Sequence, residues 1–492
     1  MITNNFPPKY KLNINENCNK CKRCAKECSF DVFTFDETEN NIVAYNKNCV
    51  ACRRCVLTCP QNAIELSENK IAFNSHFNWD YKTQNDIHKQ SDTGAKLLTS
   101  VGTGLSHKNI FDHLLLDACQ VTNPSIDPLR EPMELRTFVG RKSDNISDEI
   151  GPQLQLETPI VFAAMSFGAL SLNVHKALGN AARKAGTCMN CGEGGLHPDM
   201  VEYGPNTFVQ VASGRFGIDK EYLESGAAIE IKIGQGAKPG IGGHLPGEKI
   251  DKEISKTRMI PEGSDAISPA PHHDIYSIED LENLIYLLKE VTEYKKPVGV
   301  KISAVHNAPA IATGIVRAGA DFVAVDGLKG GTGATPATIR DNVGIPIELA
   351  ISSIDKRLRE EKIRHKASII ASGGIRSSAD ILKIIALGAD CASIGTAALI
   401  ALGCTVCESC HTNKCAWGIA TQKPELTKRL DPEEGGERVY NLLRSWSLEM
   451  KELLGSLGIT SIESLKGNRE RLRALDLDSY TMETLGVKGA GR

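Results

Sequence analysis

The sequence predicts an α/β chain in which a parallel (β/α)8 barrel follows a small N-terminal α+β module. Three observations support this prediction. Cysteines recur at short fixed intervals near the start of the chain, a pattern by which small modules hold inorganic clusters. From about residue 155, short apolar runs alternate with helical periods, as in βα units that build a parallel sheet. The 492 residues also suffice for about three domains, each with its own core.

The N-terminal cysteine pattern occurs twice, as Cys-x2-Cys-x2-Cys-x3-Cys. The first run is Cys18, Cys21, Cys24 and Cys28, and the second is Cys49, Cys52, Cys55 and Cys59. Pro60 follows the second run, as is usual, whereas Ser29 follows the first. Such runs bind [4Fe–4S] clusters, and in two-cluster ferredoxins the fourth cysteine of each run binds the other cluster. We therefore expect one cluster on Cys18, Cys21, Cys24 and Cys59, and a second on Cys28, Cys49, Cys52 and Cys55. A pair of zinc sites is the alternative, although zinc rarely needs four cysteines in one such run.

The composition argues against several classes of protein. The formal net charge is −3 and the basic residues are dispersed, so nucleic-acid binding is not expected. No apolar run approaches the roughly 18–20 residues of a membrane span, and the N-terminus lacks the apolar core of a signal peptide. Sixteen cysteines without an export signal are expected to bind metal in a reducing cytoplasm.

Four regions are expected in order along the chain. They are a ferredoxin-like module at 1–70, a linker that wraps the barrel at 71–150, the barrel at 151–425 with a cysteine-rich loop at 403–420, and a helical tail at 426–492. The eight strands are mostly continuous apolar runs, as expected for strands buried on both faces: Pro159–Ala164, Thr187–Cys191, Thr207–Ala212, Ala227–Ile233, Val298–Ser303, Asp321–Asp326, Ala367–Ala371 and Cys391–Ile394. Helices are expected at Phe111–Val121, Leu172–Ala185, Ile278–Glu293, Ala308–Ala318, Ser378–Ala386 and 435–455. Eight βα units predict a TIM barrel, with a doubly wound open sheet as the alternative.

Glycine-rich loops follow the last two predicted strands, at Ala371–Arg376 and at Gly395–Thr396. Glycines let backbone N–H groups approach a phosphate closely, and late strands are the usual phosphate position in TIM barrels. No strand-coupled GxGxxG stands in the chain, so a Rossmann nicotinamide site is not expected. A phosphate site beside iron–sulfur clusters suggests FMN, which exchanges single electrons with clusters and a hydride with a substrate.

A third cysteine group follows directly, with the spacing Cys-x2-Cys-x2-Cys-His-x3-Cys. Its members are Cys404, Cys407, Cys410 and Cys415, which would place a third cluster near the flavin. A zinc-binding or merely buried loop is the alternative. The cysteines outside these groups lie on apolar elements and are expected to be core residues: Cys119, Cys188, Cys191 and Cys391.

Seven segments between about 100 and 425 resemble the synthase domain of glutamate synthases, in order and at similar spacing. They are MSFGALS at 165–171, CGEGG at 191–195, ASGRFG at 212–217, QGAKPG at 235–240, PAPHHDIYSIED at 269–280, GGTGA at 330–334 and GTAALIALG at 395–403. The N-terminal module resembles the archaeal-type arrangement of that synthase. The resemblance implies an FMN-binding TIM barrel, an oxidoreductase of CH–NH2 donors that reduces 2-iminoglutarate, formed from 2-oxoglutarate and ammonia, to L-glutamate.

The resemblance also implies roles for single residues. Lys238 and Arg258 match basic residues that hold the 2-oxoglutarate carboxylates, and His244 stands where the family has a glutamine. Glu193 matches a glutamate between flavin and substrate, and Lys301 would stabilise the reduced flavin ring. Cofactor contacts are further expected at Ser166, Gly168, Gln210, Ser213, Gly331, Gly333, Ser372, Gly373, Gly374, Gly395 and Thr396. In the family the third cluster is [3Fe–4S], on cysteines matching Cys404, Cys410 and Cys415. With Cys407 as an extra ligand, we expect [4Fe–4S] rather than [3Fe–4S].

The resemblance implies partners as well. Residues 1–150 are too short for the amidotransferase domain of long glutamate synthases, so ammonia is expected from a separate glutaminase subunit or from solution. Electrons are expected from ferredoxin or an NAD(P)H-dependent flavoprotein subunit. Two other readings stay open: an N-methylglutamate synthase subunit that uses methylamine, and a non-catalytic electron-transfer subunit.

Overall fold

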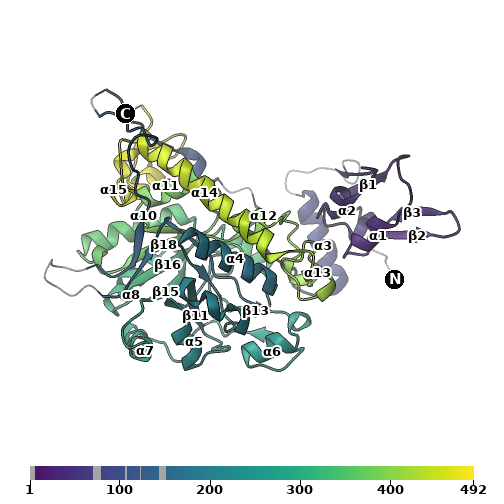
Figure 1. Ribbon diagram of the computed structural model, residues 1–492, viewed down its shortest axis with the longest axis horizontal. Helices are drawn as coiled ribbons and strands as arrows, with labels where there is room; N and C mark the ends of the chain where they lie inside the picture. Colours follow the sequence, from purple (N-terminus) through teal and green to yellow (C-terminus); the bar gives the residue numbers. More distant parts are fainter. Residues whose placement is uncertain (1–5, 70–78, 106–107, 122, 143–150, 492) are drawn as a thin grey trace.

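The chain folds into a barrel flanked by the N-terminal module, with one long helix lying across the barrel (Figure 1). The computed structural model describes residues 6–69, 79–105, 108–121, 123–142 and 151–491. The region boundaries expected at residues 70 and 150 lie outside the described residues. Among the described residues, every helix is too short or too polar to cross a lipid bilayer.

The N-terminal module is built from one short hairpin, a second antiparallel strand pair that joins its two ends, and two one-turn helices. Its elements are β1 (Tyr10–Ile14), α1 (Arg23–Glu27), β2 (Phe33–Asp36), β3 (Asn41–Ala44), α2 (Arg54–Thr58) and β4 (Ile64–Glu68). Strand β1 pairs antiparallel with β4, and β2 pairs antiparallel with β3. Alternate strand residues such as Leu12, Phe33 and Ile64 point inward to a small core against which the cysteines pack. A core this small is typical of modules that clusters help to hold together.

All eight predicted barrel strands are present, in one parallel sheet. They are β9 (Ile160–Phe162), β10 (Met189–Asn190), β11 (Thr207–Ala212), β12 (Ala228–Lys232), β15 (Val298–Ser303), β16 (Phe322–Asp326), β18 (Ser368–Ser372) and β19 (Cys391–Ile394). Neighbours in the sheet follow the chain order, with β9 beside β19. The sheet closes because the backbone N–H of Phe162 donates to the carbonyl of Cys188, just before β10, at 2.9 Å. The TIM barrel is thereby confirmed, and the doubly wound alternative is wrong.

The barrel helices agree closely with the predicted ones. Helices α4 (Leu172–Ala185) and α11 (Ser378–Ala386) have the predicted bounds, whereas α7 (Ile278–Val291) and α8 (Ala308–Arg317) end slightly earlier. Capping explains sharp starts such as that of α11, where the Ser377 hydroxyl accepts the N–H of Asp380. The other helices around the barrel are α5 (Lys220–Ser225), α6 (Lys252–Arg258), α9 (Ala337–Asn342), α10 (Ile347–Glu360) and α12 (Thr396–Ala401).

The helix predicted at Phe111–Val121 is wrong. Residues Ile110–His113 form one 3-10 turn, and Leu114–Leu116 form strand β6. This strand pairs antiparallel with β20 (Leu472–Ala474), which also pairs with β21 (Lys488–Gly489). The partner strand comes from the far end of the chain, so the apolar run LLL is held extended by a tertiary pairing that overrides its local helical pattern.

The predicted tail helix lies within α14 (Pro432–Ser456), which crosses α4 (Figure 1). Gly435 and Gly436 permit this contact, because a Cβ at Gly436 would lie 2.9 Å from the Cβ of Asn180. The tail is not purely helical, since it also contains β20 and β21 beside α15 (Ile462–Leu465) and α16 (Ser479–Leu485). The remaining elements are α3 (Tyr81–Thr93), α13 (Pro424–Thr427) and the short strand pairs β5–β17 (Leu98–Thr99, Thr335–Pro336), β7–β8 (Thr137–Gly140, Gln153–Leu156) and β13–β14 (His244–Leu245, Ala266–Ile267).

Candidate active site and cysteine groups

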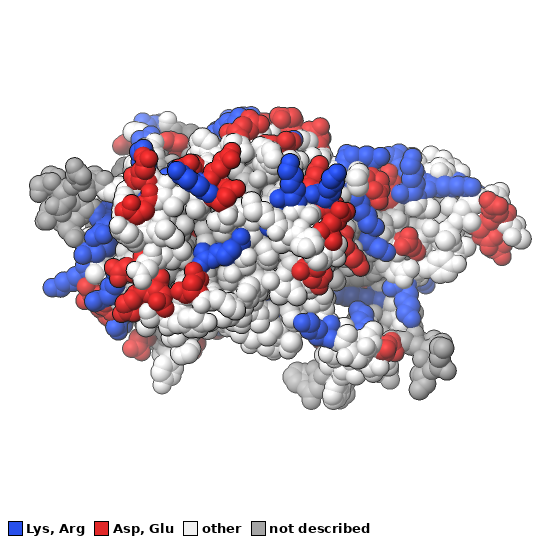
Figure 2. Space-filling model, turned by 90° about the horizontal axis from the view of Figure 1, so that it is seen from below, with Lys and Arg blue, Asp and Glu red and all other residues white. Residues whose placement is uncertain are grey.

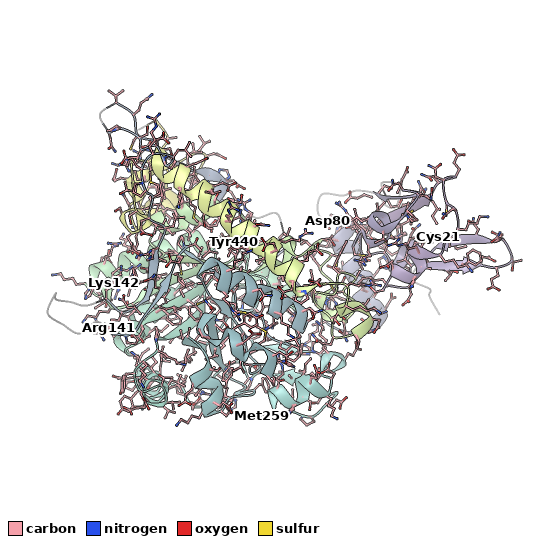
Figure 3. The ribbon with its side chains drawn as sticks, in the orientation of Figure 1. Cys21, Asp80, Arg141, Lys142, Met259 and Tyr440 are labelled. Atoms are coloured by element: carbon pink, nitrogen blue, oxygen red, sulfur yellow. The ribbon has the colours of Figure 1, made fainter. Side chains whose placement is uncertain are left out.

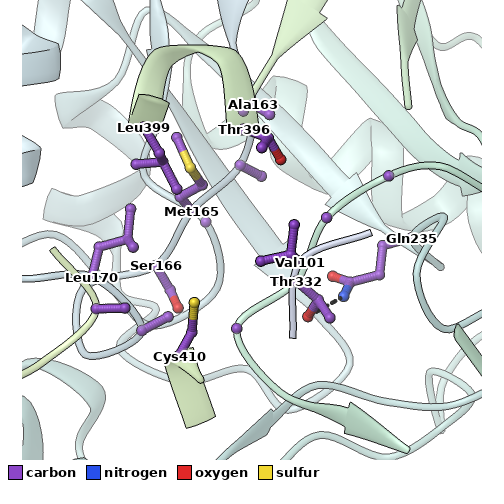
Figure 4. A pocket seen from close by; sticks show the side chains of 18 of the residues that line it. Val101, Ala163, Met165, Ser166, Leu170, Gln235, Thr332, Thr396, Leu399 and Cys410 are labelled. Atoms are coloured by element: carbon purple, nitrogen blue, oxygen red, sulfur yellow. Dashed lines mark hydrogen bonds between the residues drawn. The ribbon is translucent and has the colours of Figure 1, made fainter. Parts of the chain in front are cut away.

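One large cavity opens at the carboxyl ends of the barrel strands. Its wall combines residues that end strands, such as Lys232, Asp326 and Ser372, with the loops that follow β9, β10, β16 and β19. In TIM barrels this face carries the active site, because its loops can vary without disturbing the core. Figure 4 shows side chains from separate segments around this space, among them Ser166 after β9 and Cys410 of the cysteine-rich loop.

Glu193 is the acidic centre of the cavity. Its Oε1 lies 3.2 Å from the Lys232 ammonium, and its Oε2 accepts the Ser268 hydroxyl at 3.0 Å. Burial raises the pKa of this carboxyl, but the charges of Lys232, Lys238 and Arg258 outweigh burial and hold the pKa at about 2. Glu193 is therefore ionised throughout the neutral range.

Lys238 and Arg258 lie beside Glu193 and are almost fully buried. Burial, together with the charge of Lys232, lowers the pKa of Lys238 to about 8, and burial lowers the pKa of Arg258 to about 10. The Lys238 ammonium donates to the Ala334 carbonyl at 3.0 Å, and Arg258 Nη2 donates to the Phe167 carbonyl at 2.9 Å. Arg258 Nε is buried and has no hydrogen-bond partner among the described residues. Since a buried, unsatisfied donor is costly, the arrangement suits an anionic ligand.

The cavity wall carries more positive than negative charge. Six lysine and arginine residues line it, against two carboxylates, Glu193 and Asp326. The cations are Lys232, Lys238, Lys249, Arg258, Lys301 and Lys329. Fixed cations in a concave, partly dry site attract and orient anions, so the cavity can hold a small dicarboxylate and a phosphate group together.

The glycine-rich loops form the other end of the cavity. Gly373 and Gly374 both have positive φ angles, of 116° and 84°. A Cβ at Gly373 would lie 2.7 Å from the backbone N of Gly327, and one at Gly374 would lie 2.6 Å from the Cβ of Lys329. These positions therefore require glycine, whose missing side chain leaves backbone N–H groups accessible to a phosphate.

Eleven of the thirteen residues expected to bind the cofactor line this cavity. They are Ser166, Glu193, Gln210, Lys301, Gly331, Gly333, Ser372, Gly373, Gly374, Gly395 and Thr396. Gly168 and Ser213 do not line it. A Cβ at Gly168 would meet Leu245 and Ile254, so this glycine serves packing. The Ser213 hydroxyl donates to the Pro269 carbonyl at 2.6 Å.

His244 lines the cavity as expected, near its rim. Its Nε2 lies 3.1 Å from Asp265 Oδ2, and its side chain is 24% exposed. Asp265 also accepts the backbone N–H of Gly247 at 2.6 Å, which anchors the antiparallel strand pair β13–β14 beside the cavity. The imidazole therefore lines the cavity with one of its nitrogens directed to Asp265.

Three lysines of the wall, Lys232, Lys249 and Lys329, were not among the predicted site residues. Lys232 ends β12, where a charged residue closing an apolar strand is a usable signal. Lys249 gives no such signal, because it stands in a polar stretch, GEKIDKE. Its ammonium is buried and donates to the carbonyls of Ala169 and Ala420, each at 3.1 Å. It thus ties the loop after β9 to the cysteine-rich loop, and its pKa is lowered by burial to about 8, against the opposing influence of Cys410 and Cys415.

The cysteine-rich loop brings its four cysteines to the cavity wall. These are Cys404, Cys407, Cys410 and Cys415. Burial, with the neighbouring thiolates of Cys410, Cys415 and Cys52, raises the pKa of Cys407 to about 12. Burial and Cys415, among other neighbours, raise the pKa of Cys410 to about 11. All four cysteines thus share the cavity wall, and Cys407 lies near Cys410 and Cys415 as well as near Cys52 of the N-terminal module.

The eight N-terminal cysteines divide into two groups. The outer cysteine group, Cys18, Cys21, Cys24 and Cys59, lines a small cavity of its own. In the inner cysteine group, Cys28, Cys49, Cys52 and Cys55, burial and the other three thiolates raise the pKa of Cys55 to about 12. No three His, Cys, Asp or Glu side chains in the described ranges converge closely enough for a single metal ion. Cysteines spread around a cavity suit a cluster, in which each thiolate bonds a different iron.

The inner cysteine group lies against the cysteine-rich loop. The Cys52 carbonyl accepts the Trp417 indole N–H at 3.1 Å and the Thr405 hydroxyl at 3.3 Å. The Ser29 hydroxyl donates to the Lys414 carbonyl at 2.6 Å, so the serine that replaces the usual proline takes part in this contact. The order in space is therefore outer group, inner group, cysteine-rich loop and barrel cavity.

Comparisons with known proteins identify the family. The family model described as "Conserved region in glutamate synthase" matches residues 106–460, and one described as "4Fe-4S dicluster domain" matches residues 17–64. An "Archaeal glutamate synthase (NADPH)" of Methanocaldococcus jannaschii is 58% identical over 100% of both chains. An "Archaeal-type glutamate synthase (NADPH)" of Thermotoga maritima is 54% identical over 100% of this chain and 99% of that one. A "Glutamate synthase (NADPH) large chain" of Azospirillum brasilense is 36% identical over 73% of this chain and 24% of that one. The chain belongs to the glutamate synthase family.

Proposed function

We propose that this protein makes L-glutamate by reductive amination of 2-oxoglutarate with ammonia, through 2-iminoglutarate. The observation that supports this most is the composition of the barrel cavity. It combines six cations with one deeply ionised glutamate, between a glycine-lined phosphate end and a cysteine-rich loop. The cations would bind a dicarboxylate, the glutamate would bind the nitrogen nucleophile, the glycine-lined end would bind the phosphate of a cofactor, and the cysteine-rich loop would supply electrons.

FMN is the cofactor that the cavity fits. The glycines at 373, 374 and 395 would receive its phosphate, and Ser166, Gln210 and Lys301 would lie along its ring system. When bound, FMN supplies the hydride for the imine and accepts electrons one at a time. Lys301, buried at 7% exposure at the fourth residue of β15, supplies a fixed positive charge there.

Lys238 and Arg258 would hold the carboxylates of 2-oxoglutarate. The free Nε of Arg258, beside its bonded Nη2, leaves one edge of the guanidinium available for a carboxylate oxygen. The ammonium of Lys238 would bind as a point charge. His244 would complete the binding site from the rim, through whichever nitrogen does not face Asp265.

Glu193 would bind the ammonia-derived nitrogen. Because its pKa is held at about 2, its carboxylate stays ionised and can attract ammonium from solution or from a partner, and can stabilise the positive charge on nitrogen as ammonia attacks the keto carbon. Lys232, 3.2 Å away, keeps the carboxylate ionised and can donate a proton as water leaves. Gly243 makes room for this group, since a Cβ there would overlap Glu193 Oε1.

Electrons would enter through the N-terminal module and cross three clusters. We assign [4Fe–4S] clusters to the outer and inner cysteine groups and a third, [4Fe–4S] rather than [3Fe–4S], to the cysteine-rich loop. The contacts of Cys52 with Trp417 and Thr405 support transfer from the inner group to the loop. The donor would be ferredoxin or an NAD(P)H-dependent flavoprotein subunit, and ammonia would come from a glutaminase subunit or from solution, in the cytoplasm.

The test is product analysis on anaerobically reduced protein. With 2-oxoglutarate present, ammonia, glutamine and methylamine are offered in turn, and products are identified by mass spectrometry. Glutamate from ammonia is expected. N-Methylglutamate as the preferred product would reassign the enzyme to methylamine, and absence of both products with full flavin and iron content would make it an electron-transfer subunit.

A further inference from the structure

The outer cysteine group is the part of the electron route nearest to solvent. Of the sixteen cysteines, all of which lie in the described ranges, only Cys21 is exposed. Figure 3 places Cys21 on the N-terminal module, away from the barrel. The inner group is covered by the cysteine-rich loop through Cys52. A protein that delivers electrons from outside therefore approaches closest at Cys21.

The two cysteine runs have nearly the same backbone but different surroundings. Lys22 and Arg53 occupy equivalent positions, each with a left-handed φ, of 60° and 61°, before α1 and α2. Lys20 and Lys26 of the first run correspond to Ala51 and Leu57 of the second, and Leu57 is 68% exposed. Positions 22 and 23 are basic in both runs, as Arg53 and Arg54 show, but the loop geometry does not require the cations at positions 20 and 26. Exposure alone does not explain these two either, because the exposed counterpart of Lys26 is a leucine.

Four exposed basic residues surround Cys21, and we call them the basic patch: Lys20, Lys22, Arg23 and Lys26. No acidic residue stands between positions 17 and 26. The nearest in sequence after the patch, Glu27, is turned inward to Arg54 at 2.9 Å. In Figure 2 basic side chains gather on the module, while acidic ones occupy its outermost end. Like charges gathered on one surface steer and orient a partner of opposite charge.

We propose that the basic patch is the docking surface for an acidic electron-carrier protein, which reduces the outer cluster. Each encounter moves one electron: the carrier is oxidised by one electron and the outer cluster is reduced by one. The proposal rests on the proposed function, in which electrons enter through the N-terminal module. Docking at Cys21 shortens the transfer distance, because this cysteine is the one with no protein between it and the partner.

The test compares two charge reversals at equivalent backbone positions. Lys22→Glu removes a cation from the basic patch, whereas Arg53→Glu makes the same change of net charge beside the inner group. The probe is an acidic two-[4Fe–4S] ferredoxin. Its affinity is measured by calorimetry with both proteins oxidised, and its rate of cluster reduction by stopped flow. Iron content and circular dichroism establish that each variant is folded.

Lys22→Glu is expected to weaken binding and slow association by about five- to tenfold at low salt, with the difference vanishing at about 0.5 M salt. Arg53→Glu should stay within about twofold of wild type. Because Lys22 also lies over the Phe35 ring at 3.6 Å, the double variant Lys20→Glu, Lys26→Glu provides a second test, and its effect should exceed that of Lys22→Glu.

Equal effects of Lys22→Glu and Arg53→Glu, or no effect of the double variant, would overturn the proposal, as would wild-type protein that does not bind the ferredoxin at low salt. These outcomes are separate from failure of the proposed function. In that case ferredoxin would bind and reduce the clusters with the expected charge dependence, but no glutamate would form.

Discussion

The cysteine groups and the barrel cavity are two functional regions built on opposite principles. Each N-terminal cysteine group takes three of its four cysteines from seven consecutive residues, so the spacing along the sequence is enough to predict a cluster site. The cavity gathers Glu193, Lys232, Lys238, Arg258 and Ser268 from separate segments of the barrel face. The spacing of these residues along the sequence does not by itself predict a site.

The difference also concerns how each region tolerates change. A cluster ligand either bonds iron or does not, and a small module that depends on its clusters responds to the loss as a whole. The cavity distributes its charge over several side chains, so each contributes a fraction of binding. Loss of a cluster ligand in the N-terminal module should therefore abolish activity with a protein donor, and loss of a cavity residue should reduce activity by degrees.

The largest effect is expected from Cys52→Ala. The inner group lies between the outer group and the cysteine-rich loop, so its loss should abolish glutamate formation with a protein donor. Oxidation of chemically reduced flavin by 2-oxoglutarate and ammonia should continue, because the cavity is untouched. Both activities are measured on the same preparation, together with iron content. If the flavin half-reaction is lost as well, the clusters are structural and the contrast with the cavity fails.

Arg258→Ala and Lys238→Ala should each have a graded effect. Loss of one charged hydrogen bond to a carboxylate costs about 1.5–3 kcal/mol, or roughly ten- to hundredfold in kcat/KM for 2-oxoglutarate. Most of this should appear in KM, because the contact is made before as well as during hydride transfer. Lys256→Ala, exposed on the same helix α6, is the matched control and should change neither constant. Unchanged KM in both cavity variants would contradict the substrate assignment.

Lys232→Met should lower the maximal rate, because Lys232 is the proposed proton donor, and should also change the pH profile. Removing the nearest cation should raise the pKa of Glu193 by about 1–3 units from its present value of about 2, since burial then meets less opposition. The active form is the carboxylate, so activity is lost as pH falls through the raised pKa. The ratio of variant to wild-type half-reaction rates should therefore decline between about pH 6 and pH 4. A constant ratio over this range would mean that Lys232 does not control Glu193.

Lys249→Met should lower the reduction potential of the third cluster. The reduced cluster carries one more negative charge, and a buried ammonium near Cys410 and Cys415 stabilises that charge. Redox titration followed by electron paramagnetic resonance measures the shift. Lys414→Met is the matched control, because Lys414 adjoins Cys415 in sequence but its side chain is 41% exposed and its charge is screened by solvent. Equal shifts in the two variants would refute a special role for Lys249.

The contrast between local sequence patterns and features assembled from distant segments also determines what could be predicted from the sequence. Barrel strands were predictable because strands buried on both faces are continuous apolar runs, and β11, β15 and β19 have the predicted bounds. The strand at Leu114–Leu116 was not, because its partner β20 stands more than 350 residues away. Lys249 was equally hidden, since only the folded chain brings it to Ala169 and Ala420. Gly168 shows the converse, a glycine in a family motif that serves packing.

For Cys407, sequence spacing and position in the fold give different predictions about the ligands of the third cluster. Removal of Cys407 should affect turnover least. Family spacing assigns three ligands, on Cys404, Cys410 and Cys415, whereas the fold brings Cys407 to the same place, with Cys410, Cys415 and Cys52 as neighbours. A thiolate gathered with three others can occupy the fourth iron corner with little strain. Wild-type protein should therefore hold [4Fe–4S], with no intense [3Fe–4S] signal when oxidised, and Cys407→Ser should gain that signal. The three remaining ligands keep the cluster in place, so glutamate formation should fall only modestly.

Electron paramagnetic resonance on anaerobically purified protein, oxidised and then reduced, distinguishes the two cluster types for wild type and for Cys407→Ser. The control is Cys391→Ser, which changes a buried cysteine outside the three groups and should leave every cluster signal unchanged. Cluster type matters because it is a main determinant of potential, and a route made only of [4Fe–4S] clusters suits a low-potential donor. An intense oxidised [3Fe–4S] signal in the wild type, unaltered by Cys407→Ser, would show that spacing rather than proximity decides the ligands of the third cluster.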